Sequence, residues 1–202
     1  MKKIAIWGDS VAQGFYDAEK EGWVARLIES LKNKNKNKNP KSIFNLSISG
    51  DDTNDLLYRF EVESTARKPE LIIFAIGIND SQYYGTKDKS RISKEDSKNN
   101  LYTLIKQARK FTDKIVFVGL TRVEDEKVMP VPWKEGVFYD NENIKEYDSI
   151  IKEVCNEEKL FYIDMFNILE LSDLEDGLHP NSQGHQKMAE SIENYLVKNE
   201  LI

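Results

Sequence analysis

The sequence has 202 residues, a formal net charge of -6 from 29 Lys and Arg against 35 Asp and Glu, two His and one Cys. At about 150 residues per domain, this length favours one domain over residues 1–202. The acidic balance argues against a nucleic-acid partner, which would need a basic face. One cysteine excludes an internal disulfide and a multi-cysteine metal site, and the two histidines are the only candidates for imidazole chemistry.

The first apolar run, Ile4–Trp7, ends at Gly8. It is shorter than the core of a signal peptide, which has about 7–15 apolar residues. The rest of the sequence has no run approaching the roughly 20 apolar residues of a membrane span. We therefore expect a cytoplasmic protein without stable membrane insertion.

Short runs of apolar and β-branched residues recur along the chain. Buried parallel strands have this composition, because both of their faces are covered. The runs are Lys3–Trp7, Ile43–Leu46, Leu71–Ile76, Lys114–Leu120 and Leu160–Ile163.

Apolar residues at helical spacing follow each of these runs. The stripes are Trp23–Leu31, Leu56–Phe60, Leu101–Phe111, Ile144–Val154 and Met188–Leu196. Ser93 and Asp96 resemble a capping box before the third stripe, and Pro180 lies near the first turn of the last. The alternation predicts an α/β fold with a doubly wound, five-stranded parallel sheet and helices on both faces.

Three connecting segments have unusual composition or length. Lys32–Pro40 alternates Lys with Asn, which predicts a solvated loop. Ser81–Ser93 and Thr121–Asn143 are long, and long loops in compact domains are often lids or binding walls. Within the second, Trp133 and Tyr139 are candidate substrate-binding residues, although both could equally pack on the protein.

Small and polar residues follow most of the predicted strands. They are Gly8–Ser10, Asn45–Gly50, Gly77–Asp80 and, after a short segment, Asp176–Pro180. Ligands of open α/β sheets bind beyond the carboxyl ends of the strands. We therefore expect these segments to meet at one edge of the sheet.

The residue types at this edge suit acyl transfer. A serine such as Ser10 becomes a nucleophile when an imidazole, here His179, accepts its proton. A carboxylate three residues earlier, Asp176, can orient that imidazole. The backbone N–H groups of Ser10 and Gly50 and the side-chain amide of Asn79 are candidate donors to a developing oxyanion. We expect glycine at position 50 because a side chain would block close approach.

These segments resemble the GDSL or SGNH hydrolase family of GDSL-like lipases and acylhydrolases. Gly8–Gly14 (GDSVAQG) is similar to the first family block, and Gly50 to the second. Gly77–Asp80 and Asp176–Pro180 are similar to the later blocks, in the family's order. The leucine that usually follows the serine is Val11 here, a conservative change.

The resemblance implies a flavodoxin-like three-layer fold and hydrolysis of carboxylic esters or thioesters through an acyl-enzyme. The substrate would be a small acylated molecule, and the reaction would need no metal and no cofactor. By the same resemblance Ser10 is the nucleophile, His179 the base and Asp176 its orienting partner, with Ser10, Gly50 and Asn79 in the oxyanion hole.

Two alternatives use the same edge of the sheet. An acyltransferase or deacetylase would act on an alcohol or a sugar with the same residues. A non-catalytic flavodoxin-like module would bind a flavin or a phosphate, which the carboxylate of Asp9 disfavours. The acyl chain, the alcohol moiety and the oligomeric state stay open.

Other polar residues have structural interpretations. We expect His185 to pack on its helical stripe, Cys155 to be a core residue, and Asp9 and Asp80 to bond nearby backbone. Asp51 and Asp52 favour the start of the helix that follows them.

Overall fold

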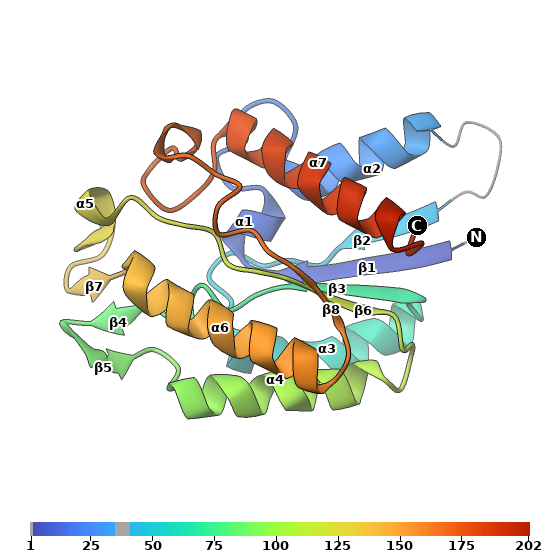
Figure 1. Ribbon diagram of the computed structural model, residues 1–202, viewed down its shortest axis with the longest axis horizontal. Coiled ribbons are helices and arrows are strands. Elements are labelled where there is room, and N and C mark those ends of the chain that lie inside the picture. Colours follow the sequence, from blue (N-terminus) through green and yellow to red (C-terminus); the bar gives the residue numbers. More distant parts are fainter. Residues whose placement is uncertain (1, 35–40) are drawn as a thin grey trace.

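One parallel sheet lies at the centre of the computed structural model, which describes residues 2–34 and 41–202 (Figure 1). Within these ranges its strands are β1 (Lys2–Gly8), β2 (Lys41–Asn45), β3 (Leu71–Ala75), β6 (Ile115–Val118) and β8 (Phe161–Ile163). Their order is β2-β1-β3-β6-β8, and every neighbouring pair is parallel. The five predicted strands and the flavodoxin-like order are confirmed.

The order of the strands reverses beside β1. Ile4 of β1 pairs with Ile43 of β2 on one side and with Leu71 of β3 on the other. The chain therefore winds outward in one direction to β2 and in the other through β3, β6 and β8. Loops that leave the carboxyl ends of β1 and β3 part at this point, which is where doubly wound sheets bind ligands.

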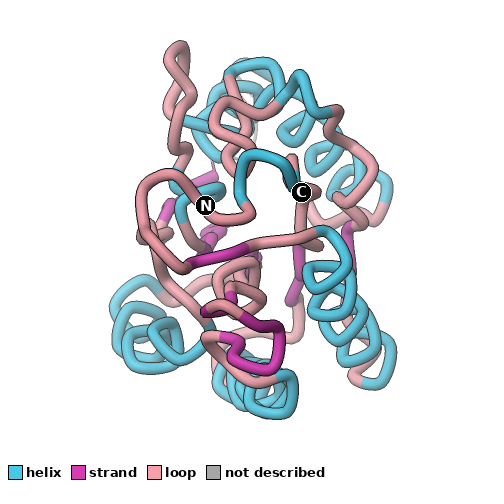
Figure 2. The backbone as a smooth tube through the Cα atoms, turned by 90° about the vertical axis from the view of Figure 1, so that its left-hand side faces the viewer, coloured by secondary structure: helices cyan, strands magenta, loops and turns pink. Residues whose placement is uncertain are grey.

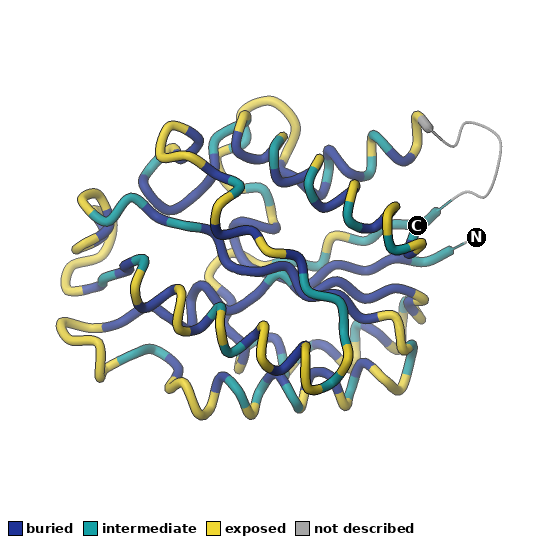
Figure 3. The backbone as a smooth tube through the Cα atoms, viewed as in Figure 1, coloured by how far each residue is buried: buried dark blue, intermediate teal, exposed yellow. Residues whose placement is uncertain are grey.

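Helices cover both faces of the sheet (Figure 1). One face carries α2 (Gly22–Lys34) and α7 (Ser182–Lys198), and the other carries α3 (Thr53–Arg67), α4 (Lys94–Ala108) and α6 (Asn141–Glu157). In β1, Ile4 and Ile6 join the core under α2 and α7, whereas Ala5 and Trp7 join the opposite core. This alternation makes both sides of the strand apolar, and Figure 3 shows the buried strands between helices with exposed outer sides. The predicted helices are confirmed, except that α4 ends at Ala108 and so does not include Phe111.

Side chains at the helix starts refine the predictions. Asp52 caps α3 in a full capping box, whereas Asp51 pairs with Arg59, 2.6 Å away. Ser93 caps α4 by accepting the Asp96 N–H, but the Asp96 carboxylate accepts the Ser93 hydroxyl, at 2.7 Å. The start of α7 is capped by Asn181, and Pro180 directly precedes this cap, near the first turn as predicted.

A small antiparallel sheet arises from the two long connections. Its strands are β4 (Tyr83–Tyr84), β5 (Thr86–Ser90) and β7 (Val137–Phe138), in the order β5-β4-β7. This sheet lies at the left-hand end of the molecule in Figure 1, which is the end that faces the viewer in Figure 2. Three short helices complete the described chain, namely α1 (Ser10–Gln13), α5 (Asp125–Val128) and the 3-10 helix η1 (Leu171–Asp173).

The expected loop over Lys32–Pro40 is only partly within the described residues. Its first residues, Lys32 to Lys34, belong to α2, and residues 35–40 lie outside the described ranges. Over the ranges that are described, every helix is too short or too polar to cross a membrane.

Candidate active site

Ser10 lies directly beyond the carboxyl end of β1. The preceding residue, Asp9, caps α1, and its carboxylate accepts the N–H of Val11 at 3.0 Å. A Cβ at Gly8 would overlap Ala12 and the backbone of the neighbouring strand β3, so only glycine permits this close turn. Ser10 is thus the first residue of α1, where its N–H has no partner within the helix.

A chain of contacts joins Ser10, His179 and Asp176. Ser10 Oγ lies 2.8 Å from His179 Nε2, and His179 Nδ1 lies 2.7 Å from Asp176 Oδ2. The other carboxylate oxygen of Asp176 accepts the backbone N–H of His179 at 2.8 Å. Burial alone would raise the pKa of Asp176, but its hydrogen bonds with His179 outweigh burial and lower the pKa. Asp176 is therefore a carboxylate at neutral pH, placed to hold a protonated imidazole.

Gly50 and Asn79 face the same pocket from the loops after β2 and β3. Gly50 has a φ of +86°, and a Cβ there would meet no atom of the described residues within 4 Å. Glycine is favoured by this left-handed backbone, and the expectation that a side chain here would block close approach stays a prediction. The Asn79 amide donates to the Asp51 carbonyl at 2.8 Å and accepts the Tyr139 hydroxyl at 2.8 Å.

The predicted site residues meet in one pocket with a volume of about 410 Å³. Its lining includes all the candidates, namely Ser10, Gly50, Asn79, Trp133, Tyr139, Asp176 and His179. It also includes Phe15, Tyr16, Gln82 and Arg91, which sequence reasoning missed. Phe15 and Tyr16 directly follow the glycine-rich segment after β1, and these two adjacent aromatic residues were the available signal.

Three aromatic rings surround the imidazole of His179. The ring centroids of Phe15, Tyr16 and Trp133 lie 5.2, 5.6 and 5.9 Å from it. All three side chains are half-exposed, whereas Tyr139 is only 4% exposed. The two aromatic candidates of the long loop thus differ, with Trp133 at the mouth of the pocket and Tyr139 in its wall.

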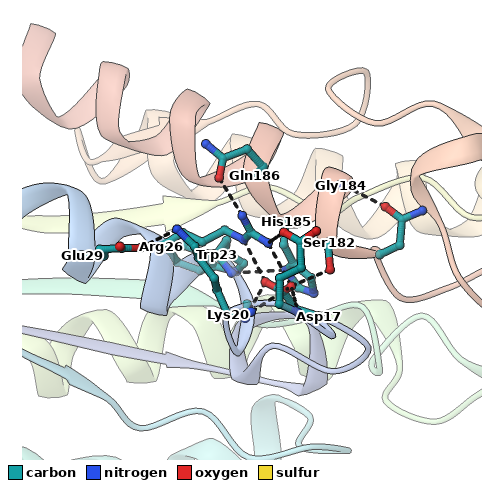
Figure 4. Close-up of polar contacts among 12 residues, drawn as sticks. Asp17, Lys20, Trp23, Arg26, Glu29, Ser182, Gly184, His185 and Gln186 are labelled. Atoms are coloured by element: carbon teal, nitrogen blue, oxygen red, sulfur yellow. Dashed lines mark hydrogen bonds and ion pairs between the residues drawn. The ribbon is translucent and has the colours of Figure 1, made fainter.

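Asp17, which directly follows Phe15 and Tyr16, takes part in the polar network that Figure 4 shows. The Asp17 carboxylate accepts Arg26 Nε at 2.8 Å and the Ser182 hydroxyl at 2.7 Å, which joins the turn to α2 and α7. These bonds hold the pKa of Asp17 well below its usual range, although burial alone would raise it. The turn that carries Phe15 and Tyr16 is therefore anchored to both helices of one layer, α2 and α7.

His185 belongs to this network. Its Nδ1 accepts the Trp23 N–H at 3.3 Å, and its Nε2 donates to the Phe15 carbonyl at 3.0 Å. A backbone N–H can only donate and a carbonyl can only accept, so these partners define one neutral tautomer. Burial lowers the pKa of His185, in keeping with a neutral ring. The prediction that His185 packs is confirmed.

The other buried polar residues have structural roles. Burial raises the pKa of Asp9 to about 7 and that of Asp80 to about 6. Asp80 accepts both the N–H and the hydroxyl of Thr53, at 2.9 and 2.7 Å, so it joins the end of β3 to α3 and not to its own turn. Cys155 is buried as predicted, and burial raises its pKa to about 12. Across residues 2–34 and 41–202, no group of three or more His, Cys, Asp or Glu side chains could hold a metal ion.

The five parallel strands in flavodoxin-like order, with helices on both faces, form the three-layer fold of SGNH hydrolases. The model of the GDSL-like Lipase/Acylhydrolase family matches residues 6–187, and the chain belongs to this family. It is 30% identical over 136 residues to a multidomain esterase of Ruminococcus flavefaciens. That match covers 63% of this chain but 16% of the relative, so the chain spans only a small part of that protein.

Solved structures share the fold. The lipase/acylhydrolase of Enterococcus faecalis superposes with a TM-score of 0.81 at 22% identity, over 98% of this chain and 97% of that one. Axe2, an acetylxylan esterase of Geobacillus stearothermophilus, superposes with a TM-score of 0.76 at 20% identity, over 96% and 94% of the two chains.

Proposed function

We propose that the protein is a serine esterase that cleaves carboxylic ester or thioester bonds of a small acylated substrate. The observation that carries this proposal is the contact chain from Ser10 through His179 to Asp176 at the pocket. Structures of Axe2 include catalytic mutants in which a serine, an aspartate and a histidine are replaced. In that enzyme the aspartate and histidine are three positions apart, as Asp176 and His179 are here.

The first half of the reaction acylates Ser10. His179 Nε2 accepts the hydroxyl proton while Ser10 Oγ attacks the substrate carbonyl carbon. The carbonyl electron pair moves onto oxygen, and the resulting oxyanion accepts hydrogen bonds from the N–H groups of Ser10 and Gly50 and from the Asn79 amide. When the tetrahedral intermediate collapses, His179 returns the proton to the leaving alcohol or thiol.

The second half regenerates the enzyme. A water molecule gives a proton to His179 and attacks the acyl carbon, and Ser10 Oγ then leaves with that proton. Asp176 keeps Nδ1 protonated, so that Nε2 always faces Ser10, and stabilises the imidazolium during both halves. If an alcohol or a sugar replaces the water, the same steps transfer the acyl group. Measuring products with and without an alcohol acceptor separates these outcomes.

The rings around His179 favour a second candidate function, the deacetylation of sugars. Phe15, Tyr16 and Trp133 present half-exposed aromatic faces at the mouth of the pocket. Aromatic faces pack well on the apolar C–H face of a sugar ring, because both surfaces are flat and apolar. Axe2 is named as an acetylxylan esterase, which adds support for an acetylated carbohydrate.

The function is tested by turnover of aryl esters of increasing chain length. The wild type should hydrolyse them, and a sharp fall beyond acetyl would favour deacetylation. Ser10→Ala and His179→Ala should abolish hydrolysis, and Asn79→Ala should lower kcat by about 10²–10³-fold. Ser149→Ala is the matched control, because Ser149 is exposed on α6 and bonds only within its helix in the described structure. Wild-type turnover by folded Ser10→Ala would refute the proposal.

A further inference from the structure

The orientation of the Asn79 amide is determined by its two partners. One partner, the Asp51 carbonyl, can only accept, so the atom 2.8 Å away from it must be the amide nitrogen. The amide oxygen therefore lies at the other position, where it accepts the hydroxyl proton of Tyr139 at 2.8 Å. One N–H of Asn79 is left, and it is the one available to the pocket.

Tyr139 is held in place beside the amide oxygen of Asn79. It directly follows β7, which pairs with β4 in the small sheet, and its N–H donates to the Val128 carbonyl at 3.1 Å. Its side chain is buried, and burial raises the pKa of its phenol far above the usual range. The phenol therefore stays protonated and serves as a donor at any pH at which the protein would work.

The hydroxyl oxygen of Tyr139 also lies 3.1 Å from Gln82 Oε1. A phenol has one proton, so it can donate to only one of the two amide oxygens at a time. The contact with Asn79 is the shorter one. Gln82 thus completes the wall beside Tyr139, and Asn79 is the preferred acceptor.

We propose that Tyr139 is a positioning residue of the oxyanion hole, which orients and polarises the Asn79 amide through its hydroxyl. This inference rests on the proposed function. An O–H donated to the amide oxygen draws electron density from the nitrogen, so the remaining N–H becomes a better donor. Without the hydroxyl, only the Asp51 carbonyl holds the amide, so the remaining N–H is positioned less firmly toward the pocket.

Tyr139→Phe removes the hydroxyl and keeps the ring. We expect kcat for an aryl acetate to fall about 10-fold with KM within about 2-fold, since a donor to the oxyanion acts in the transition state. The affinity for a boronic acid inhibitor, which becomes tetrahedral on Ser10, should fall by a similar factor. Tyr147→Phe is the matched control, because it removes a buried phenol that donates to the Ile92 carbonyl, at 2.6 Å, and that does not line the pocket.

A double-mutant cycle tests the route through Asn79. In the Asn79→Ala background, Tyr139→Phe should change kcat by less than about 2-fold, because the amide it positions is absent. A full 10-fold loss in that background, or a rise in KM at unchanged kcat, would overturn the inference while leaving the esterase proposal intact. Retained activity in Ser10→Ala would instead refute the proposed function.

If Tyr139→Phe is unstable, fluorinated tyrosines at position 139 provide a second test, because they keep the shape of the side chain. Fluorine makes the phenol a stronger donor, so kcat should rise along the series with KM unchanged. A kcat that does not vary along the series would overturn the inference.

Discussion

Asp176 holds His179 at two points, one on the backbone and one on the ring. Asp176 Oδ1 accepts the His179 N–H at 2.8 Å, and Asp176 Oδ2 lies 2.7 Å from His179 Nδ1. Because Asp176 and His179 are three residues apart, both contacts form within one turn of the chain. One side chain thus fixes the position of the imidazole and its tautomer together.

Asp176→Asn tests the second of these contacts. The variant keeps a side chain of similar shape but loses the charge that stabilises an imidazolium, and it favours the wrong tautomer. We expect kcat to fall roughly 10³–10⁴-fold with little change in the melting temperature. A variant within a few fold of wild-type kcat would exclude the proposed role of Asp176.

Gly50→Ala tests the left-handed backbone beside the pocket. An alanine at a φ of +86° should cost about 1–2 kcal/mol in the free energy of unfolding, or the loop should relax. Relaxation would turn the Gly50 N–H away from the pocket, so kcat should fall.

Gly85→Ala is the control for this strain. Gly85 has a φ of +75°, and a Cβ there would also meet no described atom within 4 Å. It lies between β4 and β5, away from the pocket lining. The control should lose similar stability and keep its kcat. Equal kcat in both variants would show that the Gly50 backbone is not needed.

Much of this fold could be predicted because its strands are continuous apolar runs, as in Leu71–Ala75. The small sheet could not, since β5 (Thr86–Ser90) is polar and becomes a strand only by pairing with β4. Its existence also determines where Tyr139 lies, because Tyr139 directly follows β7.

The site could be predicted to a similar extent. Ser10 and Asn79 follow buried parallel strands, so topology alone brings them to one edge. The ring of Tyr16 reaches the pocket through a backbone with a φ of 63°, which is rare for tyrosine. No local pattern encodes that conformation. Residues of this kind depend on tertiary contacts, such as those of Asp17 with Arg26.

Asp9→Asn tests the buried carboxyl group beside Ser10. Burial raises the pKa of Asp9 from its usual value near 3.8 to about 7, and Asp80 adds to the rise while His179 opposes it. Between about pH 3.8 and pH 7, Asp9 keeps its proton in the folded protein but has lost it in the unfolded chain. The free energy of unfolding therefore falls as the pH rises through this range. The variant stays neutral and still caps α1.

The free energy of unfolding should therefore shift in favour of Asp9→Asn, relative to wild type, between about pH 5 and pH 8. Urea titrations at both pH values measure it. Asp113→Asn, on the surface, controls for the loss of one charge. A difference that is independent of pH would contradict the raised pKa of Asp9.

Trp133→Ala tests the aromatic mouth of the pocket. If the ring packs on the alcohol half of the substrate, KM for an acetylated sugar should rise several-fold, while KM for ethyl acetate changes little. Tyr58→Ala removes an 87% exposed ring from α3 and should change neither constant. Unchanged KM for the sugar ester would exclude Trp133 from substrate binding.

The acyl-enzyme is the most direct test of the central claim. The protein is mixed with an aryl acetate, quenched in acid within the first turnover and digested, and its peptides are analysed by mass spectrometry. One acetyl group on Ser10 is the predicted result, with no acetylated peptide from Ser10→Ala. Turnover of the ester with no acetyl group on Ser10 would contradict the account.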